Sequence, residues 1–577
     1  MIKKYIKPLT LSLISYISII LIFKNISMLI LISIVPLFFL FNKQKFINSI
    51  YVYLPAFILT IFLWIYNSLQ FIWSNSFVVF KLIFVPIGLF LFFVFFISFI
   101  FSLFNKIKTL QHISKHNKYR LLLIAFSIII VSWIPLWIAE YPNTLDPDTV
   151  AQFSQIFNLE PYSNGNPLIH TLFIKILFSF FSLFTKDINL NIALISIVLM
   201  IINALVFAYT SAYVYLRTSR LYTFVISIIF FAFTSYNVSF GIQISKDTTF
   251  TLSMIMFIIS IDKFLIKQNC GNVFSLLLWS ILFSLLRKNG YYILAGTAVL
   301  ILPFIKNRKY MKLGLLLISF LIFSTIIQKP IYNQITSIAN KDLPVKKNNN
   351  KGIMPSVKNI IPLQQISYIV YREWDLTDKQ KYLITKLAPL DKIKENYNMY
   401  WVDPMLNTCE KYGDSSLYKI NKIEYFKMYF ELFAKHPFDF IESYYAMTGT
   451  YFYPFVRCPH ATSKIMTDNQ FGFKKIRLVS DKYTRNIEDF YNIQYNIPII
   501  DILHIPGIFT FFYIIVLFYF LYSRQYSKFI LITPIILNIA ILLTVVPING
   551  EFRYYYPMCA CLPLIISFII NKENSNI

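Results

Sequence analysis

Long uncharged apolar runs constrain the fold of this chain more than any other feature of its sequence. The runs 51–80, 188–216, 221–245 and 529–550 all exceed the roughly 20 residues that a helix needs to cross a bilayer. Hydrophobic residues make up 57% of the 577 positions and charged residues only 14%, so the chain has more apolar surface than a soluble core would bury. The sequence therefore predicts an all-α polytopic membrane protein.

Composition divides the chain into four predicted parts, 1–119, 120–328, 329–502 and 503–577. The third part carries 24 basic and 18 acidic residues, and its aromatic runs have helical periodicity, which favours a mainly helical domain outside the bilayer. The other three parts are expected to hold the spans. These are expected near 9–23, 28–41, 52–73, 77–104, 121–139, 188–216, 221–243, 248–266, 273–287, 290–305, 313–328, 503–523, 529–547 and 554–570, with outer helical pieces near 376–399 and 421–449.

The topology depends on the run 168–184, which would either cross the membrane or lie in its interface. Basic residues gather in cytoplasmic loops of membrane proteins. We place this run in the interface, because the later basic loops then fall on the cytoplasmic side with the earlier one. Both termini are then cytoplasmic, and the loop 140–187 and the domain 329–502 are extracytoplasmic. The later basic residues that decide this are Arg217, Arg220, Lys306, Arg308, Lys309 and Lys312.

The formal net charge of +26 does not indicate a nucleic-acid partner. Much of the excess lies in short loops between apolar runs, which is the orientation pattern of membrane proteins. No segment interleaves basic and stacking residues as a nucleic-acid groove would. We therefore expect a cell membrane protein whose partners are membrane lipids and other molecules of the cell envelope.

Asp146 and Asp148 are the sharpest candidates for chemistry, because they follow an apolar run where the chain should leave the membrane. One carboxylate near a hydroxyl can act as general base in glycosyl transfer. Two carboxylates close together could instead hold a divalent cation beside a phosphate. No other residues of the chain are assigned to a metal site. The structural alternative is a solvated Asp-Pro turn in which Asp148 caps a helix over 149–157.

Three further charged turns would lie on the same side of the membrane. Asp247 would be a third acid beside Lys246, and Arg287 is followed by a second cation, Lys288. Cations on the outer side run against the positive-inside bias, which favours a role in binding phosphate. The alternatives are a polar turn with Asp247 as N-cap and interfacial charges that snorkel. Glu551 and Arg553 open the last span. They are either interfacial anchors, or Arg553 clamps a lipid phosphate.

Histidine and cysteine give weaker signals. His170 lies in the interfacial run, where a packed histidine is the alternative to a catalytic one. Cys409 and Cys458 share the outer domain and would either form one disulfide or remain two unrelated thiols. No spacing of cysteine and histidine indicates a zinc site.

At the level of motifs and layout, residues from about 120 onward resemble the GT-C superfamily of membrane glycosyltransferases. The closest likeness is to an uncharacterised Gram-positive family of GT-C-like proteins. The matching motifs are Pro-Asn-Thr-Leu-Asp-Pro-Asp-Thr-Val-Ala-Gln (142–152), Asn-Pro-Leu-Ile-His-Thr-Leu (166–172), Ser-Lys-Asp (245–247), Lys-His-Pro (435–437) and Glu-Phe-Arg-Tyr (551–554). The chain departs from the pattern in its extra N-terminal spans and in having Asn166-Pro167 where two prolines are usual.

The resemblance implies a GT-C-like helical core, a polyprenyl-phosphate sugar donor and an acidic catalytic base. Carried onto this sequence, Asp148 is the base, with Asp146 and Asp247 as acidic neighbours. The implied substrate contacts are Lys246, Arg287, Arg553, Glu551, His170 and Gln152.

The leading expectation is therefore an integral membrane glycosyltransferase that moves a sugar from a polyprenyl-phosphate donor to a cell-envelope acceptor on the outer face. No cofactor is assigned, and a divalent cation at Asp146 and Asp148 is left as an alternative. The alternatives are a transporter or flippase of lipid-linked sugars, an envelope polymer ligase, and a scaffold without catalysis. A transporter would favour ionisable residues at mid-membrane depth, whereas the charges of this chain cluster at the predicted membrane surface.

Overall fold

Helices form the whole of the regular structure in the part of the chain that can be described. A computed structural model describes residues 10–11, 13–19, 47–73, 78–107, 117–162, 166–339, 360–413, 422–458, 469–545 and 550–571. Within these ranges there is no strand, and eight helices are long and apolar enough to cross a membrane. The chain is an all-α polytopic membrane protein, as its apolar runs predict. The predicted span 28–41 and residues 9, 12 and 20–23 of the predicted span 9–23 lie outside the described residues.

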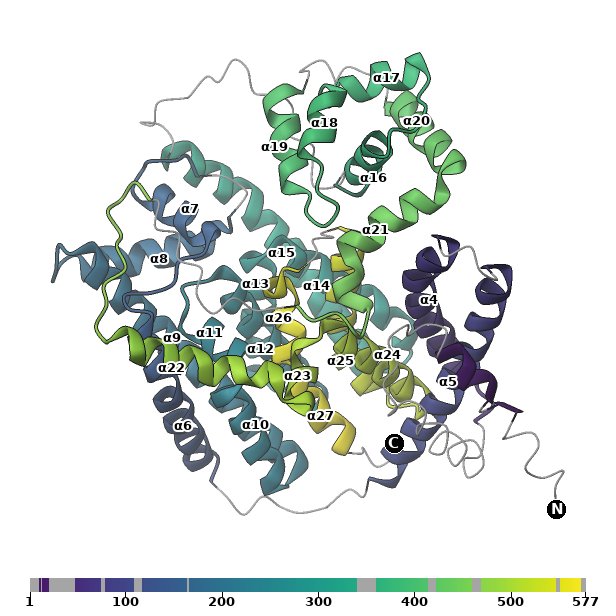
Figure 1. Cartoon of the computed structure of the whole chain (residues 1–577). Coiled ribbons are helices and arrows are strands. Elements are labelled where there is room, and N and C mark those ends of the chain that lie inside the picture. The colour runs from purple at the N-terminus through teal and green to yellow at the C-terminus, as the bar shows by residue number, and fades with distance from the viewer. Residues whose placement is uncertain are drawn as a thin grey trace.

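The apolar helices pack as a bundle (Figure 1). α12 contacts α13 on one side and α26 on the other, while α6 packs on α9, and α4 pairs with α5. Their shared core is almost entirely aliphatic and aromatic. The bundle helices are α4 (Ile50–Trp73), α5 (Val78–Lys106), α6 (Lys118–Ala139), α9 (Ile188–Thr218), α10 (Leu221–Phe233), α11 (Ser235–Ile242), α12 (Lys246–Ile266), α13 (Cys270–Leu286), α14 (Lys288–Ile301), α15 (Arg308–Ala339), α24 (Pro506–Tyr522), α25 (Tyr526–Thr544), α26 (Phe552–Ala560) and α27 (Leu562–Ile570).

The predicted span 221–243 is broken rather than continuous. α10 ends at Phe233, Thr234 is extended, and α11 continues at an angle of 61°. Gln494 satisfies both sides of the break, because its side chain accepts from the amide of Ser235 (3.1 Å) and donates to the carbonyl of Phe233 (2.7 Å). Buried backbone groups need such partners, which explains how the break is tolerated.

Gly241 allows α11 to approach α6 closely. A Cβ at this position would lie 2.5 Å from the ring of Trp133, which is completely buried. The indole of Trp133 also donates to the carbonyl of Phe231 (3.1 Å). The indole thus locks α6 against the broken span, just below the point where the chain enters the loop 140–187.

α7 (Pro147–Ile156) and α8 (Leu168–Phe181) follow α6. The 14 residues of α8 make a helix of about 21 Å, which is shorter than the apolar core of a bilayer. α8 packs against α7, α9 and α13. Its length favours the interfacial alternative for this run over a full span.

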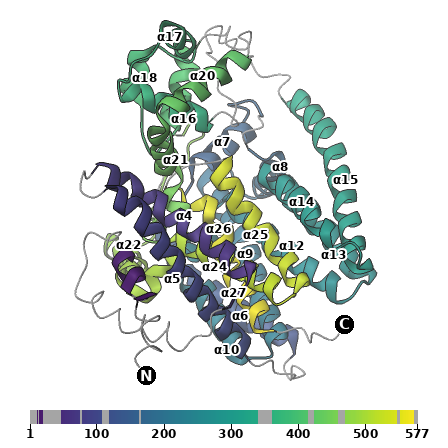
Figure 2. The same ribbon diagram turned by 90° about the vertical axis from the view of Figure 1, so that its right-hand side faces the viewer.

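Residues 360–413 and 422–435 form a lobe with an apolar core of its own. The lobe stands at the end of the bundle where α7 lies, as both views show, and α21 leads from it back to the bundle (Figures 1 and 2). Cys409 is buried in the lobe core and Cys458 in the bundle core, both as free thiols, so they form no disulfide. The lobe helices are α16 (Ile360–Tyr371), α17 (Asp378–Thr385), α18 (Leu390–Asn396), α19 (Asp403–Tyr412) and α20 (Lys422–Lys435), followed by α21 (Pro437–Phe452).

Each of the two helical pieces predicted in this region is in fact a pair of helices. α17 and α18 divide 376–399, and α20 and α21 divide 421–449. Both second helices follow a proline, Pro389 before α18 and Pro437 at the start of α21. Proline has no amide hydrogen and disfavours helical geometry in the residue before it, so each break falls where the sequence requires it.

A segment after the lobe, residues 469–475, straps α7 to the bundle. Phe471 packs on Phe153 (5.7 Å between ring centroids) and Phe157 (5.4 Å) of the α7 region. Lys475 pairs with the buried Glu140 at 3.1 Å. The chain then continues into α22 (Asp481–Asn492) and α23 (Pro498–Asp501). The strap therefore fixes α7 from outside the bundle.

We predict that Phe471→Ala loosens α7. Removing a buried phenylalanine ring costs about 3 kcal/mol, and here the loss falls on the packing that holds α7. Hydrogen exchange of the α7 amides should accelerate while exchange in α12 is unchanged. The matched control is Phe438→Ala, which removes a ring that is 52% exposed. Equal α7 exchange in the two variants would contradict the role of the strap.

Candidate functional site

α7 begins with a capped turn that sets the position of Asp148. Asp146 is the N-cap, since its carboxylate accepts from the amide of Thr149 at 2.6 Å, and Pro147 occupies the first helical position. The sequence also allowed Asp148 to be the N-cap of this helix. That alternative is wrong, because the N-cap lies two residues earlier, at Asp146. Because Asp146 does the capping, the carboxylate of Asp148 remains available for other partners.

α12 begins in the same way. The hydroxyl of Ser245 accepts from the amide of Asp247 at 3.2 Å, so Ser245 is the N-cap and Asp247 is not, contrary to the sequence-based alternative. The two helix starts touch, because Thr149 donates to the carbonyl of Ile244 at 2.5 Å. Ser245 also lies 3.5 Å from Asp146. The first turns of α7 and α12 thus form one surface.

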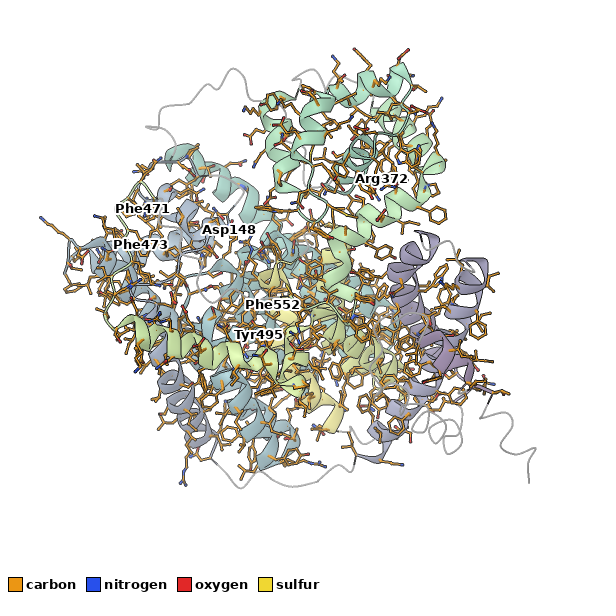
Figure 3. The ribbon with its side chains drawn as sticks, viewed as in Figure 1. Asp148, Arg372, Phe471, Phe473, Tyr495 and Phe552 are labelled. Atoms are coloured by element: carbon orange, nitrogen blue, oxygen red, sulfur yellow. The ribbon has the colours of Figure 1, made fainter. Side chains whose placement is uncertain are left out.

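Asp148 is shared by two cations from different helices. One oxygen, Oδ2, lies 3.2 Å from Nζ of Lys246 and 2.7 Å from a guanidinium nitrogen of Arg553. Figure 3 places Asp148 at the lobe-facing end of the bundle. Burial alone would raise the pKa of Asp148, but the charges of Lys246 and Arg553 outweigh it and hold the pKa below its usual range. Asp148 is therefore ionised at neutral pH.

The pKa of Asp146 is shifted in the opposite direction, upwards. Burial raises the pKa of Asp146 despite its hydrogen bond from Thr149, and the neighbouring charge of Asp148 raises it further. Two adjacent carboxyl groups whose pKa values are moved apart are typical of sites that handle protons.

A second ion pair lies beside the first. Arg287 contacts Asp247 at 3.0 Å, and the Asp247 side chain is 1% exposed. The ring of Tyr554 lies next to both guanidinium groups, at 4.8 Å from Arg287 and 4.9 Å from Arg553. Arg553 also lies 3.1 Å from Glu551. Tyr554 belongs to the Glu-Phe-Arg-Tyr motif but was not among the predicted site residues, and in the structure its ring lies beside two cations.

His170 and Gln152 stand behind the charged groups and hold them in place. The amide of Gln152 donates to Thr171 at 2.9 Å, and its carbonyl lies 3.1 Å from Nδ1 of His170. Asn166, at the entry to α8, accepts from Lys246 at 2.7 Å. His170 is completely buried, and burial, helped by the charge of Lys246, lowers its pKa to about 3. It is therefore neutral at pH 7 and is placed to position α7 against α8.

The structure thus brings together nearly all of the residues that the sequence singled out. Asp148, Lys246 and Arg553 are in direct contact, with Asp247 and Arg287 adjacent. Glu551 contacts Arg553, Asp146 caps the helix that carries Asp148, and His170 and Gln152 form the layer behind this group. The pair Glu140–Lys475 was missed, because its partners are 335 positions apart and no motif links them.

The acids do not fit a resident divalent cation. Among the described residues no three His, Cys, Asp or Glu side chains gather as a metal-binding group. The Oδ2 oxygen of Asp148 already faces two cations, and Asp146 is engaged as the helix cap. A metal ion here would have to displace Lys246 and Arg553, so no step of the chemistry is derived through one.

We predict that His170 makes stability fall in mild acid. Since its folded pKa is about 3 and its unfolded pKa about 6.5, the unfolded chain binds the extra proton as pH drops below 6.5. Stability is then lost between pH 6.5 and 3, by about 2 kcal/mol at pH 5. Denaturant unfolding at pH 7 and pH 5 should show this loss in the wild type and a smaller one in His170→Asn. Equal losses in the two proteins would contradict it.

Comparison with curated proteins and with solved structures gives no match. A family described as "Family of unknown function (DUF6020)" matches residues 160–577, which is most of the chain and includes Lys246, Arg287 and Arg553 but not Asp148. The matched region begins just after α7. The chain belongs to the DUF6020 family.

Proposed function

We propose that this protein is an integral membrane glycosyltransferase. It transfers a sugar from a polyprenyl-phosphate donor to a cell-envelope acceptor, such as a polysaccharide, teichoic acid, lipid or protein, on the outer face of the cell membrane. The site lies at one end of a membrane bundle, where a lipid-linked donor can present its head group while its tail stays in the bilayer. Interfacial placement of α8 would provide a surface for that tail.

The observation that carries the proposal is the convergence of Lys246 and Arg553 on one carboxylate oxygen of Asp148. Glycosyl transfer from a lipid phosphate needs a base at the acceptor hydroxyl and positive charge at the departing phosphate. The three side chains supply both requirements within a few ångströms. Arg287 adds a third positive charge next to them.

The transfer step follows from this arrangement. The carboxylate of Asp148 takes the proton of the acceptor hydroxyl while the oxygen of that hydroxyl bonds to the anomeric carbon of the donor sugar. The bond between that carbon and the phosphate oxygen breaks, and its electron pair remains on the phosphate. Lys246 and Arg553 stabilise the polyprenyl phosphate that departs. The products are the glycosylated acceptor and the free lipid phosphate.

Without a donor, Asp148 is a weak base because its two cations lower its pKa. A donor phosphate competes for the same cations, since its two non-bridging oxygens are negatively charged and also accept their hydrogen bonds, and its negative charge grows as the sugar departs. Once Lys246 and Arg553 turn to the phosphate, the pKa of Asp148 rises towards the usual carboxyl range. Donor binding thereby releases the base that the next step needs.

We predict that Asp148→Asn abolishes transfer. The amide keeps the size of the side chain but takes up no proton, so the rate should fall about 10²–10⁴-fold, as when a general base is lost. The measurement is transfer of labelled sugar from a polyprenyl-phosphate hexose to envelope extract by the purified protein. The matched control, Asp378→Asn on the exposed start of α17, should retain the wild-type rate.

Wild-type activity in Asp148→Asn, at equal expression and folding, would refute the assigned base. Movement of labelled lipid-linked sugar across vesicles without transfer would support the transporter alternative instead.

We predict that Arg553→Ala mainly weakens donor binding. Losing one charged hydrogen-bonding partner of the phosphate costs about 2 kcal/mol, so KM for the donor should rise roughly 30-fold. KM for the acceptor should change little. Arg477→Ala is the matched control, because it removes an exposed arginine paired with Asp481 on the surface. A rise confined to the acceptor KM would contradict the role of Arg553.

A further inference from the structure

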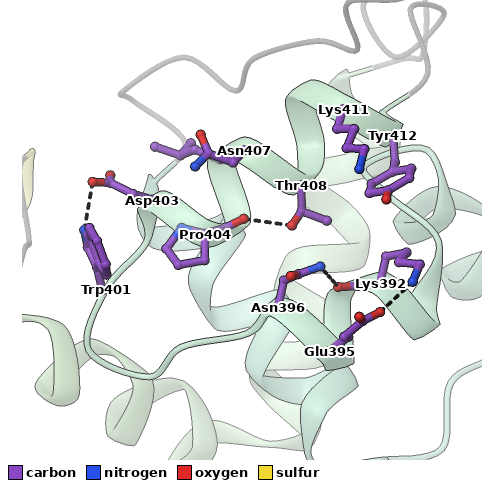
Figure 4. A pocket seen from close by; sticks show the side chains of 11 residues that line it. Lys392, Glu395, Asn396, Trp401, Asp403, Pro404, Asn407, Thr408, Lys411 and Tyr412 are labelled. Atoms are coloured by element: carbon purple, nitrogen blue, oxygen red, sulfur yellow. Dashed lines mark hydrogen bonds and ion pairs between the residues drawn. The ribbon is translucent and has the colours of Figure 1, made fainter. Parts of the chain in front are cut away.

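The lobe contains a pocket of about 750 Å³ between α18 and α19 (Figure 4). This volume falls within the range of small-molecule binding sites, roughly 300–1,000 Å³. The pocket belongs to the lobe, and none of its lining residues belongs to the Asp148 site. The side chains that matter most are those of Trp401, Tyr412, Asn396, Asn407, Thr408 and Asp403.

Two aromatic side chains bracket the pocket. Trp401 is 48% exposed and Tyr412 is 38% exposed, and Figure 4 shows them at opposite ends with Thr408 and Asn396 between them. Trp401 is held in place, since its indole donates to Asp403 at 2.8 Å. A single exposed aromatic residue is ordinary. Two exposed rings at the ends of one polar pocket instead offer flat apolar faces for a ligand to stack on.

The space between the rings is polar and nearly neutral. The amide nitrogen of Asn396 and the hydroxyl of Thr408 donate to the carbonyls of Lys392 (3.0 Å) and Pro404 (2.7 Å), so their oxygens act towards the pocket as acceptors only. The exposed amide of Asn407 has no hydrogen-bond partner within the described part of the lobe.

Lys392 pairs with Glu395 at 2.6 Å, and the two other charged lining residues, Asp403 and Lys411, have opposite signs, so the lining carries no net charge. The ammonium of Lys411 lies 4.9 Å from the centre of the Tyr412 ring. Such a lining suits an uncharged ligand rich in hydroxyl groups better than a phosphate or a nucleic acid.

The loop that carries Trp401 is shaped in advance. The side-chain carbonyl of Asn398 accepts from the amides of Tyr400 (2.9 Å) and Trp401 (3.1 Å). The next residue, Val402, and Met405 of α19 are buried in the lobe core. A ligand therefore meets a pocket whose walls are already ordered, which lowers the entropic cost of binding.

We propose that this pocket binds a segment of neutral oligosaccharide, the growing or recipient glycan of the acceptor. A sugar ring has an apolar face for stacking on Trp401 or Tyr412 and hydroxyl groups for Asn396, Asn407 and Asp403. The assignment rests on the proposed function, which supplies the need for an acceptor. The lobe and α7, which carries Asp148, occupy the same end of the bundle (Figures 1 and 3), so a chain held in the lobe lies on the side where the proposed transfer takes place.

The test measures oligosaccharide binding by the full-length protein in nanodiscs. The probes are chitotetraose, maltotetraose and mannotetraose, followed by saturation-transfer NMR and calorimetry. At least one probe should bind, and Trp401→Ala and Tyr412→Ala should each weaken its binding about tenfold. The matched controls Trp374→Ala and Tyr382→Ala remove exposed rings of the same lobe outside the pocket and should bind as the wild type does.

Several results would overturn the proposal. These are binding of none of the three probes, binding that survives both pocket variants, and Trp401-dependent binding of unglycosylated tryptic peptides in place of sugars.

A second measurement separates the pocket from the transfer site. Asp148→Asn should lose transfer but keep oligosaccharide binding, while Trp401→Ala should raise the acceptor KM about tenfold with the donor KM unchanged. Transfer with an unchanged acceptor KM in Trp401→Ala would refute the pocket and leave the proposed function standing. Sugar binding without transfer of any donor sugar would refute the function and leave the pocket standing.

Discussion

The carboxylate of Asp148, shared between Lys246 and Arg553, joins three helices that lie far apart in the sequence. It lies on α7, while its partners open α12 and α26. Partly buried charges of this kind are costly to keep out of water, and removing one partner leaves the others uncompensated. The packing of α12 on α26, the cap on α7 and the strap over it must all be in place for the three side chains to meet. The group is thus a product of the whole bundle.

The side chains around this group have different structural roles. Asp146 takes the capping role and leaves Asp148 free for its cations, while Gln152 and the neutral His170 tie α7 to α8. Tyr554 lies beside both arginines, whose like charges would otherwise repel. The site combines a charged front with an uncharged, buried support. With this division, the charged side chains of the front can change partners without disturbing the helices that carry them.

Most of the membrane helices and the cluster of charges could be predicted, because apolar runs and charged turns are local signals. The exact N-cap residues of α7 and α12 could not be predicted. Each of the segments Asp146-Pro147-Asp148 and Ser245-Lys246-Asp247 offers more than one capping side chain within three positions. The breaks at Pro389 and Pro437 were readable from proline alone. Contacts between distant segments, such as Phe471 on α7, leave no local pattern and needed the structure.

Gln494 has a consequence for how the protein is made. Its side chain satisfies the break between α10 and α11, yet it lies about 260 positions further along the chain. A ribosome has therefore delivered all of the lobe before the broken span receives its partner, and Arg553 follows later still. Until then the exposed amide of Ser235 and carbonyl of Phe233 must rely on water or on the insertion machinery. Completion of the bundle therefore depends on prior synthesis of the lobe, so a chain that stalls in the lobe leaves an unfinished membrane part and an unassembled site.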